Sequence, residues 1–332
     1  MPVEPKALKL SVGMRRWNEL NPGQQLAAVR EICGTRGMAL QKRFDGVIAV
    51  GAGFKMSAGI VSEAICLGLL VQKKRTIRVA RPIPPRLGFS LKRGASRLRI
   101  SVPTDVEELG EGEPHAVNVA QGIRAFNRHN PSQGVPGAAC CLVEDVNQPS
   151  DRYVLSCRHV LALSLISGEC AAFNDTDVAD RAMSTRIGQL FFPLPMASNG
   201  QPCLDGAISL LDPSIPVQWQ AQGVTPATVE PGVDQPSNCY VFTPNGPLPA
   251  AFVKEWANVQ LQYANCGTVV IAGAYQFQAD TVGGHSGSPV MTQDGTLFGM
   301  HFWGDPGQRL ALAIPAFMLF QHGRFPVDIR LA

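Results

Sequence analysis

The sequence predicts a mainly β protein that is preceded by a small α+β module. From Ala138 onward, short apolar runs alternate with turns rich in Gly, Pro, Asn and Asp, and helical periodicity is almost absent before residues 313–320. This spacing is typical of an all-β barrel or sandwich. Ahead of it, one amphipathic segment and two β-type runs indicate a separate unit. A chain of 332 residues is long enough for two domains.

The expected elements follow from caps, periodicity and breakers. Asn21 and Pro22 form a helix start, and Gly34 is expected to end that helix. In chain order we expect a helix at 22–34, strands at 47–54 and 64–71, a proline-broken stretch at 82–85, a strand at 97–109, a helix with a linker at 116–134, and a short closing helix within 313–320.

Composition excludes several classes of protein. Apolar residues make up 45% of the chain and charged residues 17%, so the chain is not disordered. No apolar stretch approaches the ~20 residues that span a bilayer, so no membrane partner is expected. The first twenty residues lack the apolar core and cleavage site of a secretory signal. We therefore expect a cytoplasmic protein.

The net charge of +3 hides an asymmetry between the two parts of the chain. Residues 1–100 contain 19 Lys and Arg against 5 Asp and Glu, whereas residues 101–332 contain 10 against 21. The stretch GEGEPH at 110–115 is the best candidate for a boundary. We expect a basic α+β module over 1–125 and a second domain over 126–332.

Cysteine and histidine spacing argues against a metal site. Nine cysteines are an odd number without a C-x-x-C pair, and the six histidines form no H-x-x-x-H spacing. We expect the cysteines to be mostly small buried hydrophobes in a reducing compartment. No cofactor and no metal are expected.

A serine in a glycine-rich stretch lies near the C-terminal end, in GGHSGSPV at 283–290. Glycine tolerates a tight turn in which amide N–H groups and the Ser286 hydroxyl point to one place. Alone, the pattern fits a nucleophile and an ordinary turn equally. Two upstream features favour the nucleophile: His159 follows an apolar run in RYVLSCRHVLALS, and Asp205 begins another in CLDGAISLL. A serine nucleophile needs a histidine base, which needs a carboxylate partner.

These stretches resemble motifs of the trypsin-like (chymotrypsin-fold) serine peptidases. YVLSCRHVLA resembles their His-bearing strand and turn, LDGAISLL their Asp strand, and GHSGSP their nucleophile loop. The chain order His, Asp, Ser is also theirs. The resemblance covers roughly residues 134–322 and implies a trypsin-like double β-barrel peptidase domain.

The resemblance implies a serine endopeptidase that works through an acyl-enzyme. Ser286 would be the nucleophile, His159 the general base and then acid, and Asp205 the orienting carboxylate. The amides of Gly284 and Ser286 would form the oxyanion hole.

Substrate-binding residues are also implied by the resemblance. The backbone of Phe302, Trp303 and Gly304 would pair with an extended protein or peptide substrate. Asp280, six residues before Ser286, matches the place of the acid in trypsin's specificity pocket. A preference for Arg or Lys follows if this register holds, and a solvated loop aspartate is the alternative.

One departure from the family pattern stands next to the nucleophile. His285 replaces the acid that pairs with a newly cut N-terminus in secreted members, so activation by propeptide cleavage is not expected. A catalytically silent homologue that binds peptides or partners in the same cleft is the second reading. An α/β hydrolase is disfavoured, because it needs Ser before Asp and His.

The N-terminal region resembles a different part of the trypsin-like group. GVIAVGAGFKMSAGIVSEAICLGLLVQKKR, IPPRL and SVPTDVEELGEG are similar to the region before the peptidase domain in the narrow-leaf family of plant trypsin-like peptidases and bacterial relatives. This implies a module for assembly, regulation or recruitment. Aromatic residues are sparse there, so nucleic acid is a less favoured partner than the chain's own acidic part or a homo-oligomer.

Overall fold

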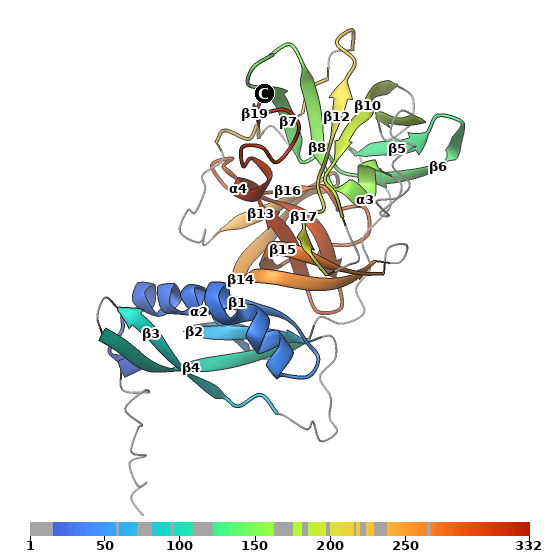
Figure 1. Ribbon diagram of the computed structural model, residues 1–332. Helices are drawn as coiled ribbons and strands as arrows, with labels where there is room; N and C mark the ends of the chain where they lie inside the picture. The colour runs from blue at the N-terminus through green and yellow to red at the C-terminus, as the bar shows by residue number, and fades with distance from the viewer. Residues whose placement is uncertain are drawn as a thin grey trace, which may run out of the picture. The chain divides into compact units, whose positions relative to one another are not determined.

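The chain folds into two compact units, Met1–Glu108 and Leu109–Ala332. The structure, a computed structural model, describes residues 16–57, 60–71, 82–93, 96–108, 122–162, 175–180, 185–196, 200–215, 217–219, 224–228, 238–263 and 267–332 (Figure 1). The division lies ahead of the boundary expected between residues 125 and 126. The candidate boundary stretch 110–115 lies outside the described residues.

The first unit contains one long helix, α2 (Pro22–Arg43). Asn21 caps it, because its side chain accepts from the Gln24 amide while the Gln24 side chain accepts from the Asn21 amide. The expected end at Gly34 is wrong: the helix continues to Arg43. The buried face of the helix continues at Gly37 and Leu40. Packing against the sheet therefore extends the helix beyond Gly34, although glycine is a weak helix former.

Four strands form the sheet beneath α2. They are β1 (Val47–Ser57), β2 (Ile60–Val71), β3 (Arg86–Arg93) and β4 (Ser96–Glu108), in the order β1-β2-β4-β3. β2 and β4 are parallel, whereas β1–β2 and β3–β4 are antiparallel. Figure 1 shows α2 lying along this sheet, and α2 packs on β1 and β2. The strands expected at 47–54, 64–71 and 97–109 are confirmed.

The second unit begins with an eight-stranded sheet of order β19-β7-β8-β12-β10-β9-β5-β6. Its strands are β5 (Ile123–Asn127), β6 (Asn130–Gly137), β7 (Cys141–Asp145), β8 (Arg152–Ser156), β9 (Thr176–Asp180), β10 (Arg186–Pro193), β12 (Ala207–Leu211) and β19 (Ile329–Leu331). The helix expected within 116–134 is wrong for residues 123–134, which belong to the β5–β6 hairpin.

Six further strands of the described chain pair in a closed antiparallel ring, in the order β13-β14-β15-β18-β17-β16 and back to β13. They are β13 (Cys239–Thr243), β14 (Gly246–Tyr263), β15 (Gly267–Gln278), β16 (Pro289–Thr292), β17 (Leu297–Asp305) and β18 (Leu310–Pro315). The short β11 (Pro202–Cys203) adds in parallel to β15. The mainly β prediction, with a small α+β unit in front, is confirmed.

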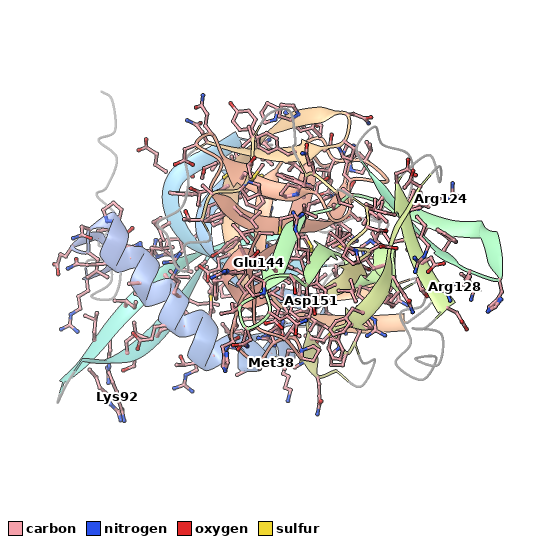
Figure 2. The ribbon with its side chains drawn as sticks, turned by 90° about the horizontal axis from the view of Figure 1, so that it is seen from above. Met38, Lys92, Arg124, Arg128, Glu144 and Asp151 are labelled. Carbon is pink, nitrogen blue, oxygen red and sulfur yellow. The ribbon has the colours of Figure 1, made fainter. Side chains whose placement is uncertain are left out.

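Packing and charge hold the second unit together. Phe252, Phe277 and Phe298 form edge-to-face pairs in the core of the ring, and Tyr275 stacks on Phe298 with ring centroids 4.6 Å apart. In the eight-stranded sheet, the buried Asp177 of β9 accepts hydrogen bonds from Arg128, seen on the β5–β6 turn in Figure 2. Aromatic packing thus fills the ring, and an ion pair joins β9 to the β5–β6 turn.

Most of the described cysteines are buried, as the sequence predicts. All seven described cysteines are free thiols, and all but Cys203 are buried. In the part of the chain that is described, no helix is both long and apolar enough to cross a bilayer.

Candidate active site

His159 and Asp205 lie at the ends of neighbouring strands of the eight-stranded sheet. β8 ends at Ser156, and the one-turn helix α3 (Arg158–Leu161) presents His159 directly after it. Asp205 stands in the short connection between β11 and β12, and β12 pairs with β8. Sequence-distant residues therefore meet because their strands are adjacent.

The Asp205 carboxylate holds His159 at two points. The His159 backbone amide donates to Asp205 Oδ1 at 3.0 Å, and the ring Nδ1 lies 2.5 Å from Asp205 Oδ2. Burial alone would raise the pKa of the Asp205 carboxyl, but the charge of His159 and its hydrogen bonds outweigh burial and hold that pKa below its usual value. The carboxylate therefore fixes the ring and leaves Nε2 on the opposite side.

The His159 Nε2 atom is buried and has no hydrogen-bond partner among the described residues. A buried polar atom without a partner costs free energy and calls for an explanation. In a ring whose Nδ1 is held by a carboxylate, Nε2 is the atom that can take up a proton from a nucleophile.

Tyr263 is a member of the site that sequence reasoning missed. Its hydroxyl donates to Asp205 Oδ2 at 2.9 Å, and its ring centroid lies 6.1 Å from that of His159. Tyr263 ends β14, where Val259, Leu261 and Tyr263 alternate with exposed glutamines. This alternation was the available signal: it predicts a buried tyrosine, although it does not name the partner.

Ser286 lies in the turn between β15 and β16, which is held by backbone hydrogen bonds. Gly284 and Gly287 have positive φ angles of 88° and 90°. The Ser286 carbonyl accepts from the Ala138 amide at 2.8 Å, and the Gly287 amide donates to the His301 carbonyl at 2.8 Å. A Cβ atom at Gly287 would overlap the Ala138 carbonyl oxygen, so only glycine fits there.

His285 organises the same turn. Its Nδ1 accepts from the Val282 amide at 3.2 Å, its own amide donates to the Val282 carbonyl at 3.2 Å, and its carbonyl accepts from the Ser288 amide at 3.0 Å. These contacts make His285 a residue that shapes the turn.

Two backbone amides of this turn make no hydrogen bond within the described residues. Within the described residues, neither the Gly284 nor the Ser286 amide makes a hydrogen bond, while the amides of His285, Gly287 and Ser288 all do. Unbonded N–H groups beside a serine hydroxyl can bind a developing oxyanion. They are the two amides that the sequence singles out.

The Ser286 hydroxyl itself does not bond to His159. It donates to the Phe302 carbonyl at 3.3 Å, and Ser286 is fully buried. The pairing of β17 with β18 shifts between His301 and Trp303, and this bulge leaves the Phe302 carbonyl outside the ladder. The structure thus joins His159 to Asp205 and turns Ser286 to a different acceptor.

The residues expected to bind substrate lie on β17. Phe302, Trp303 and Gly304 are buried. Among the described residues, Trp303 and Gly304 pair with β18, the bulge leaves out Phe302, and none of the three pairs with β16, whose pairing stops at Met300. Asp280 follows the end of β15 at Gln278: its side chain is 62% exposed, and its Oδ1 pairs with Arg309 Nε at 2.7 Å. Its charge is therefore shared with a cation of the chain itself.

Cys157, His159 and Asp205 offer three potential metal-ligand atoms within 4.8 Å of one another. Burial and the charge of Asp205 raise the pKa of the Cys157 thiol well above its usual value, so the thiolate form that binds metal is disfavoured. The thiol donates to the His301 carbonyl instead. The chemistry of these three side chains therefore fits a hydrogen-bonded His–Asp pair better than a metal site.

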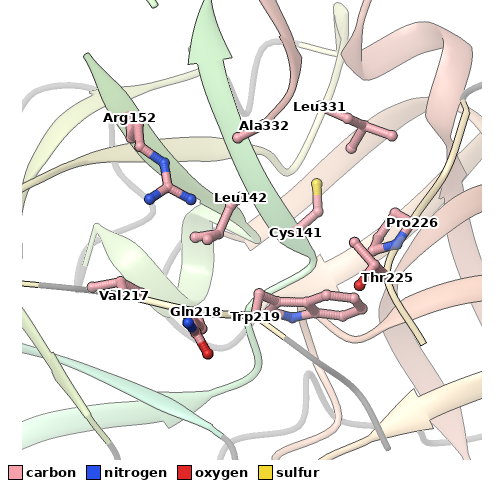
Figure 3. A pocket seen from close by; sticks show the side chains of 10 residues that line it. All are labelled: Cys141, Leu142, Arg152, Val217, Gln218, Trp219, Thr225, Pro226, Leu331 and Ala332. Carbon is pink, nitrogen blue, oxygen red and sulfur yellow. The ribbon is translucent and has the colours of Figure 1, made fainter. Parts of the chain in front are cut away.

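A cavity of about 350 Å³ lies apart from the predicted site residues (Figure 3). Trp219 and Arg152 line it together with Cys141 and the last residue, Ala332. The Trp219 Nε1 donates to the Ala139 carbonyl, which fixes the indole in the cavity wall.

Comparisons with known proteins return only distant likenesses. No family model and no curated protein matches the chain. Among solved structures, the chain is similar to Protease A of Thermobifida fusca, with 16% identity, 64% of this chain and 99% of that chain covered, and a TM-score of 0.42. The chain is also similar to the active form of the Rv3671c protease of M. tuberculosis, with 15% identity, 65% of this chain and 82% of that chain covered, and a TM-score of 0.40. A third similar structure is a glutamic acid-specific serine protease, with 12% identity, 65% of this chain and 100% of that chain covered, and a TM-score of 0.39. These structures are all serine proteases of the trypsin-like fold.

Proposed function

We propose that this protein is a serine endopeptidase that cleaves peptide bonds through an acyl-enzyme. The observation that carries the proposal is the buried, unpartnered Nε2 of His159, on a ring whose Nδ1 is held by Asp205. The unbonded amides of Gly284 and Ser286 support it independently. The narrow-leaf resemblance of the N-terminal region and the cytoplasmic location stay predictions.

The proposed reaction starts when the Ser286 hydroxyl leaves the Phe302 carbonyl and turns to His159. Nε2 accepts the hydroxyl proton as Oγ attacks the substrate carbonyl carbon, and Asp205 stabilises the imidazolium. The Gly284 and Ser286 amides stabilise the oxyanion. His159 then donates its proton to the leaving amine, and water hydrolyses the acyl-enzyme with His159 again as the base.

The proposed substrate is an extended peptide that pairs with the open edge of β17 at Phe302, Trp303 and Gly304. Their side chains are buried, so recognition on this edge uses backbone groups. We propose Asp280 as the residue that favours Arg or Lys at the cleaved position. A substrate cation would have to displace Arg309, so Arg309→Ala is expected to strengthen this preference and Asp280→Asn to remove it.

A fluorophosphonate probe tests the proposed nucleophile. We expect it to label the wild-type chain and to leave Ser286→Ala and His159→Ala unlabelled. Ser288→Ala is the matched control, since Ser288 is equally buried in the same turn and its hydroxyl makes no hydrogen bond within the described residues. Equal labelling of Ser286→Ala, or no labelling of the wild type, would contradict the proposal.

A second candidate is a catalytically silent homologue that binds peptides at the same edge of β17. The hydrogen bond from the Ser286 hydroxyl to Phe302, in place of His159, favours it. Peptide binding without any covalent adduct in intact-mass spectra would identify this case.

A further inference from the structure

Tyr263 gives the closed ring of strands a direct hydrogen bond to the His–Asp pair. His159 follows β8 of the eight-stranded sheet, and Asp205 lies between β11, which pairs with β15, and β12 of the eight-stranded sheet. Tyr263 is the last residue of β14 in the ring. Ser286 lies in a turn of that same ring, between β15 and β16. The base and the nucleophile thus stand on different sheets, and their alignment requires a link between the two.

The Asp205 carboxylate receives three hydrogen bonds, two from His159 and one from Tyr263. Among the described residues, the Tyr263 hydroxyl is the one side chain of the ring that donates to this carboxylate. Tyr263 is fully buried, and a buried tyrosine hydroxyl needs a polar partner. Its backbone is fixed as well, because Tyr263 pairs with Gly267 at the end of the β14–β15 hairpin.

We propose that Tyr263 is a positioning residue: its hydroxyl holds Asp205, and through it the His159 ring, in register with the sheet that carries Ser286. This inference rests on the proposed function and deepens it, because it assigns part of the alignment of base and nucleophile to one hydrogen bond made directly to the Asp205 carboxylate. A hydrogen bond to a charged, buried acceptor is among the strongest side-chain contacts.

The chemistry of a phenol fits this role. Burial and the Asp205 charge raise the pKa of Tyr263 well above its usual value, so the hydroxyl stays a donor throughout the working pH range. The ionisable groups that face it in the described chain are Asp205, His159, Cys157 and Cys203. The hydroxyl also shares the negative charge of the carboxylate, which reduces the electrostatic attraction between Asp205 and a positively charged His159 ring.

Tyr263→Phe removes the hydroxyl and keeps the ring. The Asp205 charge is then shared less, so the imidazolium form of His159 is favoured. We expect the midpoint of the His159 ring titration, followed by NMR, to move to higher pH, and the rate of fluorophosphonate labelling near neutral pH to fall about tenfold. Tyr240→Phe, on β13 of the same ring and without a hydrogen bond to the pair, should change neither.

Several outcomes separate the two proposals. A titration midpoint that stays in place or moves to lower pH in Tyr263→Phe overturns the positioning role, whatever the labelling rate. Absence of labelling in the wild type overturns the proposed function, and the NMR titration then still tests the Tyr263 contact. If Tyr263→Phe is too unstable to titrate, urea unfolding of Asp205→Asn, Tyr263→Phe and the double variant decides. Non-additive changes in the free energy of unfolding support the contact, and additive changes overturn it.

Discussion

At the scale of single residues, Asp205 is the group on which the site depends. Its carboxylate is fully buried, yet its pKa is held below the usual value because His159 and Tyr263 compensate for the loss of solvent. A buried carboxylate without these donors would take up a proton. The cost of burial is thus offset by the contacts that the proposed chemistry needs.

Asp205→Asn is expected to keep the volume and lose the charge. In a well-ordered triad, an amide at this place leaves the wrong histidine tautomer and lowers the rate about 10⁴-fold. We expect a loss of labelling of comparable size, measured as the second-order rate constant with a fluorophosphonate. A rate within about tenfold of the wild type would contradict the assigned role.

The same substitution predicts a pH-dependent change in stability. A carboxyl with a lowered pKa stabilises the folded state above its unfolded pKa of about 4, and this contribution disappears as the pH falls through the folded value. The wild type should therefore exceed Asp205→Asn by about 1–3 kcal/mol in the free energy of unfolding at pH 7. Urea titrations at pH 7, 5 and 3 should show this gap closing below about pH 4, and a constant gap would contradict the linkage.

At the scale of elements, the turn between β15 and β16 decides whether a nucleophile can be presented. Gly284 and Gly287 supply its left-handed positions, and the amides of Ala138 and Gly287 tie it to neighbouring segments. Because the turn is fixed at both sides of Ser286, the two unbonded amides keep their direction without a ligand.

Gly287→Ala tests how tightly this turn is built. The new Cβ would overlap the Ala138 carbonyl oxygen at a φ of 90°, so we expect a loss of about 2 kcal/mol or more in the free energy of unfolding, and no labelling. Gly323→Ala is the matched control: its φ is 73°, and a Cβ there meets nothing within 4 Å. Equal losses in the two variants would show that backbone strain alone accounts for the effect.

The sequence predicted elements well where a local pattern decides them. The strands at 47–54 and 64–71 follow from short apolar runs, whereas the helix end at Gly34 and the β5–β6 hairpin depend on packing partners far along the chain. In the site, motif order pointed to His159, Asp205 and Ser286. It could not show that Tyr263 donates to Asp205, or that a bulge in β17 offers Ser286 a different acceptor.

At the scale of the whole molecule, the chain consists of a basic first unit and an acidic remainder. The division at Glu108 nearly coincides with the change of charge near residue 100. We propose that the first unit serves assembly or recruitment, and that its positive charge is directed at the acidic unit of the same chain or of a second copy.

Salt dependence tests this proposal on the full chain. The Debye length falls from about 30 Å at 10 mM salt to about 3 Å at 1 M, so an attraction between the units should be screened. Small-angle scattering should show the radius of gyration rising with salt if the contact is within one chain, or the mass falling if it joins two copies. If neither quantity depends on salt, the proposed attraction is wrong.

The central claim is that Ser286 becomes acylated with His159 and Asp205 as its base. Intact-mass spectrometry during turnover of a 4-nitrophenyl ester, followed by peptide mapping, tests it most directly. We predict one added acyl group on Ser286 in the wild type and none in Ser286→Ala. Hydrolysis without any adduct, or an adduct that persists in Ser286→Ala, would contradict the claim.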